Sequence, residues 1–137
     1  MNKPLFLLFL LSIILYAAPT ACPQFYADGE VPEIMNEKLA SKTKELCFEA
    51  FGVMHSGISK TPLWSAELLT RDKLESKIPR KDVFHEENQL PANERAELSD
   101  YAHSGYDRGH MSASADAPTP SAQAESFTLA NMIPSSP

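Results

Sequence analysis

Residues 104–116 read SGYDRGHMSASAD, and the expected fold and chemistry follow from this stretch. Gly105 favours a turn, and the residues after it read as a strand that ends at His110. Side chains two residues apart in a strand lie on one face, so the sequence predicts that Arg108 and His110 project together. Gly109 places no side chain between them, which lets another backbone or a phosphate approach closely.

The residue types at this strand suit attack on a phosphodiester. An imidazole that titrates near neutral pH can act as a general base, so His110 is predicted to activate water. The guanidinium of Arg108 would stabilise charge on the phosphoryl oxygens. Acyl transfer fits less well because the chain has no G-x-S-x-G elbow. A zinc site is not expected, because the histidine spacings match no usual zinc-ligand pair. The alternative is a structural turn in which Asp107 pairs with Arg108.

The N-terminus has the pattern of a secretory signal peptide. Its sequence MNKPLFLLFLLSIILYAAPTAC has one early cation, Lys3, and then an apolar run of 14 residues. That run is shorter than the roughly 20 residues that span a bilayer. We therefore expect residues 1–21 to be removed and residues 22–137 to form one exported domain, periplasmic or extracellular, with no stable membrane insertion. An uncleaved anchor, or a lipoprotein with Cys22 first, remains open.

Net charge bears on nucleic-acid binding, and the cysteine content bears on disulfide formation. The formal net charge is −6 and becomes −7 without Lys3, because 12 − 1 = 11 cations then face 18 acids. This is a modest argument against nucleic-acid binding, although a local basic site is compatible with it. Cys22 and Cys47 are the only cysteines, and an even count in an exported chain predicts one disulfide. Two unlinked thiols are the alternative.

Apolar runs and turn residues give a coarse map of the fold. Residues 46–55 and 63–70 read as two strands of a hairpin, and residues 126–133 read as a closing strand. Residues 33–45 contain good helix formers with a weak apolar stripe. Residues 112–123 are small, polar and proline-rich, which predicts a loop. The expected class is α+β, a mainly antiparallel sheet with flanking short helices.

Three stretches together carry a family resemblance: KTPLWSAELLT, LPANERAELSDYAHSGYDRGHMSASAD and SFTLANMIP. They resemble the DNA/RNA non-specific endonucleases, which have the ββα-metal (His-Me finger) fold. The similarity extends from about Cys47 to the end of the chain. The D-R-G-H motif, with Ala115 five residues after the histidine, and the later S-F-x-L-x-N-M-x-P strand are its specific parts.

The resemblance implies a role for each matching residue. His110 matches the general base that activates water, and Arg108 matches the residue that stabilises the pentavalent transition state. Asp107 matches a supporting position, and Asn131 matches an asparagine that shapes the site without holding the metal. The family uses one largely hydrated Mg²⁺ to stabilise the leaving 3′ oxygen. It cuts DNA and RNA alike and leaves 5′-phosphate ends.

The resemblance also predicts something that this chain lacks. The family's metal-holding asparagine lies about nine residues after the position of Asn131, which is beyond Pro137. We therefore expect a partial domain that is incomplete at its C-terminus, with no metal ligand in this chain and little activity. A missing helix would leave an exposed apolar patch at residues 127–133. The alternatives are a non-catalytic exported protein that binds nucleic acid or a partner, and a small structural protein. No oligomeric state is predicted.

Overall fold

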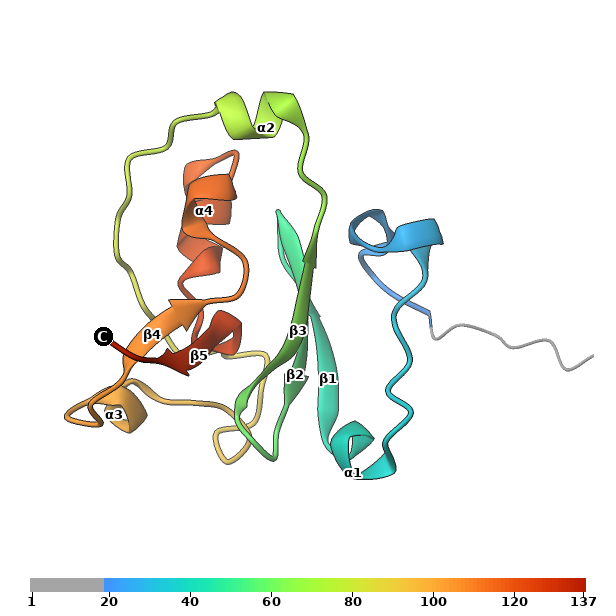
Figure 1. The fold of residues 1–137 in the computed structure, drawn as a ribbon, viewed down its shortest axis with the longest axis vertical. Helices are drawn as coiled ribbons and strands as arrows, with labels where there is room; N and C mark the ends of the chain where they lie inside the picture. Colours follow the sequence, from blue (N-terminus) through green and yellow to red (C-terminus); the bar gives the residue numbers. More distant parts are fainter. Residues whose placement is uncertain (1–18) are drawn as a thin grey trace, which may run out of the picture.

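A computed structural model describes residues 19–137 (Figure 1). All but the last three residues of the predicted signal peptide, residues 1–21, lie outside the described part of the chain. Among residues 19–137, no helix has the length and apolar character needed to cross a membrane. The structure describes all of the predicted domain, residues 22–137.

Two small antiparallel sheets form the framework. The first is a meander in the order β1-β2-β3, made of Thr43–Cys47, Phe51–Ser56 and Thr61–Glu67. The second is the pair β4, Asp107–His110, and β5, Met132–Ser135. These strands and the short helices confirm the predicted α+β class.

The helices are all short, and several are single 3-10 turns. They are η1 (Pro23–Phe25), η2 (Ala27–Gly29), α1 (Glu37–Ala40), α2 (Arg71–Glu75), α3 (Leu98–Tyr101), η3 (Ser114–Asp116), α4 (Pro120–Ser126) and η4 (Leu129–Asn131). At several helices, the side chain of the residue just before the first turn caps the helix by accepting a hydrogen bond from a backbone N–H. Thr119 shows this at α4, where its hydroxyl accepts a hydrogen bond from the backbone N–H of Ala122 at 3.1 Å.

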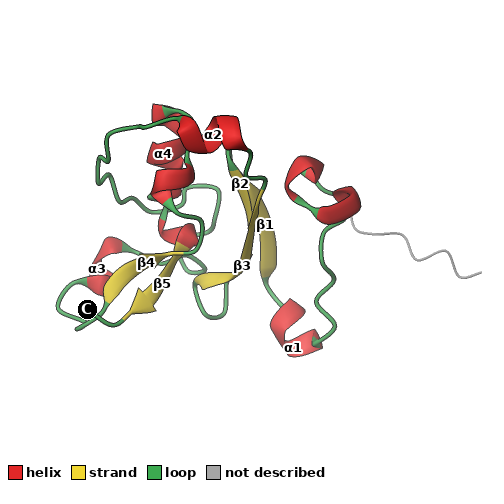
Figure 2. Ribbon diagram, turned by 45° about the horizontal axis from the view of Figure 1, so that its top comes forward, coloured by secondary structure: helices red, strands yellow, loops and turns green. Residues whose placement is uncertain are grey.

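The three-stranded sheet lies between two coverings (Figures 1 and 2). On one side, Phe51 and Val53 of β2 pack with Ala117 and Ala122, so this face lies against α4 and the loop before it. On the other side, the N-terminal arm of residues 20–31 lies along the sheet. Because both faces are covered, every residue of β2 except Met54 is buried.

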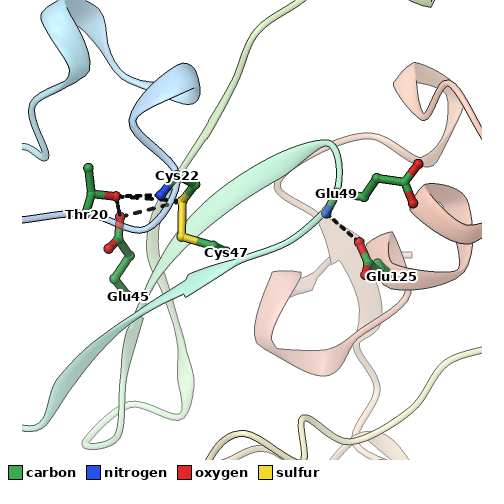
Figure 3. Close-up of a disulfide and its surroundings, with 6 residues drawn as sticks. All are labelled: Thr20, Cys22, Glu45, Cys47, Glu49 and Glu125. Carbon is green, nitrogen blue, oxygen red and sulfur yellow. Dashed lines mark hydrogen bonds between the residues drawn. A yellow bond between two sulfur atoms is a disulfide. The ribbon is translucent and has the colours of Figure 1, made fainter.

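A disulfide holds the N-terminal arm to the sheet (Figure 3). Cys22 and Cys47 are joined with an S–S distance of 2.05 Å and a Cα–Cα distance of 5.8 Å. Beside it, the hydroxyl of Thr20 donates a hydrogen bond of 2.6 Å to the carboxylate of Glu45. The arm is thus joined to β1 by one covalent link and one polar contact.

The arm buries aromatic side chains on this face. Tyr26 meets Trp64 edge to face, with ring centroids 5.5 Å apart, so Trp64 lies half-buried beneath the arm. The Tyr26 hydroxyl lies over Gly52, where an added Cβ would come within 2.7 Å of it. Glycine at this position therefore allows the arm to approach the strand closely.

The turn between β1 and β2 is docked on α4. The carboxylate of Glu49 accepts hydrogen bonds of 2.6 Å from the hydroxyls of Thr119 and Ser121, which lowers the pKa of that carboxyl. In return, the carboxylate of Glu125 accepts from the backbone N–H of Glu49 at 2.6 Å (Figure 3). These contacts fix α4 over the sheet.

Several predicted elements differ from the structure in their boundaries. Residues 46–55 form two strands rather than one, because the backbone turns where Phe48 donates to the carbonyl of Phe51 at 2.9 Å. Residues 33–45 are helical only at α1, after which Lys42 adopts a φ of 56° and β1 begins. Residues 126–133 start at the end of α4 and pass through η4, and only their last two residues enter β5.

The predicted exposed apolar patch at residues 127–133 is wrong. Phe127, Leu129 and Met132 are each 0% exposed. The physical reason is that this segment packs on the three-stranded sheet, where η4 contacts β2 and β3. Residues 112–123, predicted as a loop, also include η3 and the first part of α4. Ala96 and Phe84 pack against Leu129 and Met132.

The disulfide yields the first prediction. Replacing Cys22 and Cys47 together by serine frees a loop of 25 residues and should lower the free energy of unfolding by about 3 kcal/mol. Urea unfolding followed by the fluorescence of Trp64, the only tryptophan, measures this change. Reductant should lower the midpoint of the wild-type chain and leave the double variant unchanged. An equal midpoint for the two oxidised proteins would contradict the prediction.

Candidate active site

The β4–β5 pair presents Arg108 and His110 from a short, tightly held strand. His110 lies opposite Met132, and the backbone N–H of Met111 continues the pairing by donating to the carbonyl of Asn131 at 2.9 Å. Between the two functional side chains, a Cβ on Gly109 would overlap the hydroxyl of Ser135. The glycine predicted to allow close approach therefore admits a side chain of β5.

Asn131 fastens the end of this strand from within the core. Its side chain is 0% exposed, and its Oδ1 accepts a hydrogen bond from the backbone N–H of Ser112 at 2.9 Å. Its Nδ2 donates to the carbonyls of Ser112 and Ser126, both at 2.9 Å. The amide thus joins the segment after His110 to the end of α4, and its oxygen is not available as a metal ligand.

Phe84 lies under both functional side chains. The guanidinium carbon of Arg108 lies 3.9 Å from the centre of the Phe84 ring, and the His110 ring centroid lies 5.9 Å from it. Both side chains therefore share one face of β4, as their spacing predicts. Phe84 is positioned by the backbone of His85, which donates to the carbonyl of Phe127 at 3.3 Å and accepts from Leu129 at 2.8 Å.

His110 is partly enclosed by aromatic rings. The Phe127 ring meets it edge to face, with centroids 4.8 Å apart. The Nε2 atom is buried and has no hydrogen-bond partner among the described residues. Burial lowers the pKa of His110 below its ordinary value of 6.5; the positive charge of Arg80 lowers it further, and Asp82 acts in the opposite direction. The imidazole is therefore neutral at pH 7, as a general base must be.

Arg80 and Phe84 belong to the neighbourhood of His110, and sequence reasoning missed both. The guanidinium carbon of Arg80 lies 5.3 Å from the centre of the Phe127 ring, and its Nε donates to the Asp82 carboxylate at 2.6 Å. The segment that carries them is charged and has no helix or strand periodicity. The only available signal was an arginine next to Pro79, which by itself does not indicate a site.

Asp107 behaves differently from its two neighbours. Its side chain is exposed, and within residues 19–137 no hydrogen bond or ion pair of its carboxylate is found. The structure therefore places the Asp107 side chain at the surface beside the site, with no hydrogen bond or ion pair to the Arg108 side chain. The Asp107–Arg108 ion pair of the structural-turn alternative is absent from the described residues.

The described residues bring together one group of side chains with metal-ligating atoms. Cys22, Glu45 and Cys47 have one such atom each, all within 4.8 Å of one another. Both sulfurs are already bonded to each other in the disulfide, so neither is a thiolate that could bind an ion. This group also lies on the arm side of the sheet, away from His110 (Figures 1 and 3).

The arrangement of the two sheets corresponds to a known nuclease fold. A chain in a crystal structure entitled as the EndoG/EndoGI complex and the mechanism of EndoG inhibition superposes with a TM-score of 0.70, covering 87% of this chain and 46% of that chain. The sequence identity is 24%, so this similarity concerns the fold alone. The fold is the α+β architecture of the ββα-metal nucleases.

Sequence comparison identifies the family. The family model described as DNA/RNA non-specific endonuclease matches residues 30–136, and the chain belongs to this family of metal-dependent, hydrolytic nucleases. Similar proteins include a mitochondrial nuclease of Saccharomyces cerevisiae, 36% identical over 89 residues, which are 63% of this chain and 27% of that protein. Human mitochondrial Endonuclease G is 31% identical over 91 residues, 65% of this chain and 31% of that protein. The chain thus spans about a third of these relatives or less.

The role of Asn131 can be tested by an isosteric change. Asn131→Asp keeps the shape but cannot donate to the carbonyls of Ser112 and Ser126, and it places a charge in the core. We expect a loss of about 3 kcal/mol of unfolding free energy, measured by urea denaturation. Asn36→Asp is the matched control, because Asn36 is exposed and only its oxygen is used, as an acceptor at the start of α1. Equal stability of the two variants would contradict this account.

The pKa of His110 can be measured by the NMR titration of its ring protons. We expect a midpoint below 6.5, because burial disfavours the imidazolium. Arg80→Gln should raise the midpoint, and Asp82→Asn should lower it. Since the unfolded state binds the proton more readily, the contribution of His110 to stability is complete above pH 6.5 and is lost as the pH falls through the lowered pKa. A wild-type midpoint at or above 6.5 would refute the proposed environment.

Proposed function

We propose that this chain carries the catalytic strand of an exported endonuclease that hydrolyses phosphodiester bonds of DNA and RNA without sequence specificity. The observation that supports this most directly is the position of Arg108 and His110 side by side against Phe84. A cation and a neutral imidazole on one face can act on the same phosphate. The family membership of the chain points to the same chemistry.

In this proposal His110 removes a proton from the attacking water. Because Nε2 is enclosed without a partner, we assign Nδ1 as the proton acceptor. The low pKa of the ring keeps it unprotonated at neutral pH, and the resulting imidazolium passes the proton on to solvent. Asn131 is a positioning residue here, since it fixes the backbone two residues after His110.

Arg108 is assigned to the negative charge that develops on the phosphoryl oxygens. It forms no ion pair within residues 19–137, so its guanidinium is free to bind an anion. Its place over the Phe84 ring restricts its orientation, which lowers the entropy cost of binding a phosphate. Arg80 is a second cation near His110, and its guanidinium is paired with Asp82 at 2.6 Å.

We propose Mg²⁺ as the metal of the reaction, where it would stabilise charge on the leaving oxygen. The described residues do not fit this ion. The amide oxygen of Asn131 is buried and accepts a hydrogen bond from Ser112, and two of the three clustered ligating atoms are the sulfurs of the disulfide. We therefore assign no residue of this chain to the metal and expect cleavage by the chain alone to be weak.

Export is the second part of the proposal. The Cys22–Cys47 disulfide supports it, because such bonds persist in oxidising compartments such as the periplasm and the medium. The N-terminal pattern of an early lysine and an apolar run supports it independently.

Cleavage assays test the catalytic assignment. Plasmid DNA and an RNA transcript are incubated with Mg²⁺ and either the purified chain or a fusion that continues it with the following segment of human Endonuclease G. We expect the fusion to cut both substrates, and His110→Ala to lower the rate at least about a hundredfold, as general-base loss does.

Two controls separate the possible outcomes. Met35→Ala, a change at an exposed side chain far from β4 in the sequence, should leave the rate unchanged. Cleavage that survives His110→Ala would refute the assigned base. Binding of nucleic acid without cleavage by either protein would favour the alternative of a non-catalytic binding protein.

A further inference from the structure

Two hollows near the start of β4 share two of their lining residues, and Arg108 lines one of them. The first, about 310 Å³, is lined by Arg108, Leu98, Tyr101 and Tyr106. The second, about 240 Å³, is lined by the same two tyrosines together with residues of the β2–β3 turn and β5. Tyr101 and Tyr106 border both hollows, and Arg108, the proposed phosphate position, lines the first hollow with them. Figure 2 shows α3, which carries Tyr101, next to β4 and β5.

The two tyrosines differ in burial in a way that suits stacking. Tyr106 is 57% exposed although it is a large aromatic side chain that directly precedes β4. Tyr101 is half-buried against Leu129 and Met132, and burial raises the pKa of its hydroxyl, so it stays neutral. A fixed ring and an accessible ring on one surface can hold a flat heterocycle.

Charge determines which part of a polynucleotide can occupy this surface. Each hollow is lined by one acid and one cation, Asp107 and Arg108 in the first and Asp100 and Lys60 in the second. A second phosphate in either hollow would meet a carboxylate as well as the cation. A neutral base against the tyrosines, with its phosphate at Arg108, places no further negative charge beside these carboxylates.

We propose that Tyr101 and Tyr106 form a nucleobase subsite that holds an unpaired base next to the phosphate bound at Arg108. The proposal rests on the proposed function, because Arg108 must hold that phosphate. In a duplex the faces of the bases are stacked inside the helix and cannot lie on the tyrosines. The subsite therefore favours single-stranded nucleic acid over duplex.

Binding measured without divalent metal tests the subsite independently of catalysis. Fluorescence anisotropy is recorded with a labelled decathymidine, with an abasic strand of the same length, and with a duplex. We expect the wild-type chain to bind the decathymidine at least about fivefold more tightly than the abasic strand, as the loss of stacking implies. Tyr106→Ala should weaken binding of the decathymidine by a similar factor and remove its advantage over the abasic strand.

Matched variants give each outcome one meaning. Tyr106→Phe keeps the ring and should bind as the wild type does, whereas Met35→Ala controls for loss of exposed apolar surface elsewhere. If Tyr106→Ala binds like Met35→Ala, or if the wild type does not distinguish the abasic strand, the subsite is refuted. If Arg108→Ala then still weakens the binding of all strands equally, the phosphate site is supported without the base site. If the wild-type chain binds no strand, both assignments fall.

Discussion

The buried amide of Asn131 is the interaction on which the candidate site depends. It satisfies three backbone groups of Ser112 and Ser126 that have no water around them. Leaving such groups unpaired in the core costs about 1–3 kcal/mol each, so separation of the two segments is unfavourable. The strand that carries His110 is therefore held at its end by a side chain that never touches solvent. The geometry of the site is therefore set by hydrogen bonds buried in the core and not by contacts at the surface.

The aromatic rings around β4 link stability to the chemistry. Phe127 belongs to the core at 0% exposure, and it also encloses one edge of His110. The same low-polarity surroundings that exclude water from the core disfavour the imidazolium, so the neutral form of His110 follows from packing. Phe84 continues this surface outward to Arg108, where a cation over a ring face keeps its charge available. Loosening these rings would therefore raise the pKa of His110 as well as weaken the core.

Sequence reasoning could predict only the features that arise between residues close together in the chain. The common face of Arg108 and His110 follows from the two-residue period of a strand, and the α+β class follows from the separate apolar runs. Phe84 and Arg80 lie in a segment without periodicity, so only tertiary structure brings them to His110. Burial of residues 127–133 was missed because η4 packs on β2 and β3, which lie far from it along the chain. The α4 helix was predicted as a loop because it consists largely of small and polar residues. Its start was visible in Thr119, a capping residue followed by proline at the first helical position.

The central sheet separates the disulfide-bonded arm from the elements of the candidate site. The arm, its disulfide and Trp64 lie on one side, and α4 with the β4–β5 pair lies on the other (Figure 1). The disulfide thus stabilises the sheet without touching the residues assigned to the phosphate. Glu49 connects the two, because its turn ends β1, where Cys47 is bonded, and its carboxylate holds the start of α4. The same turn therefore contacts both the disulfide-bonded strand and the helix whose last residue Asn131 joins to the segment after His110.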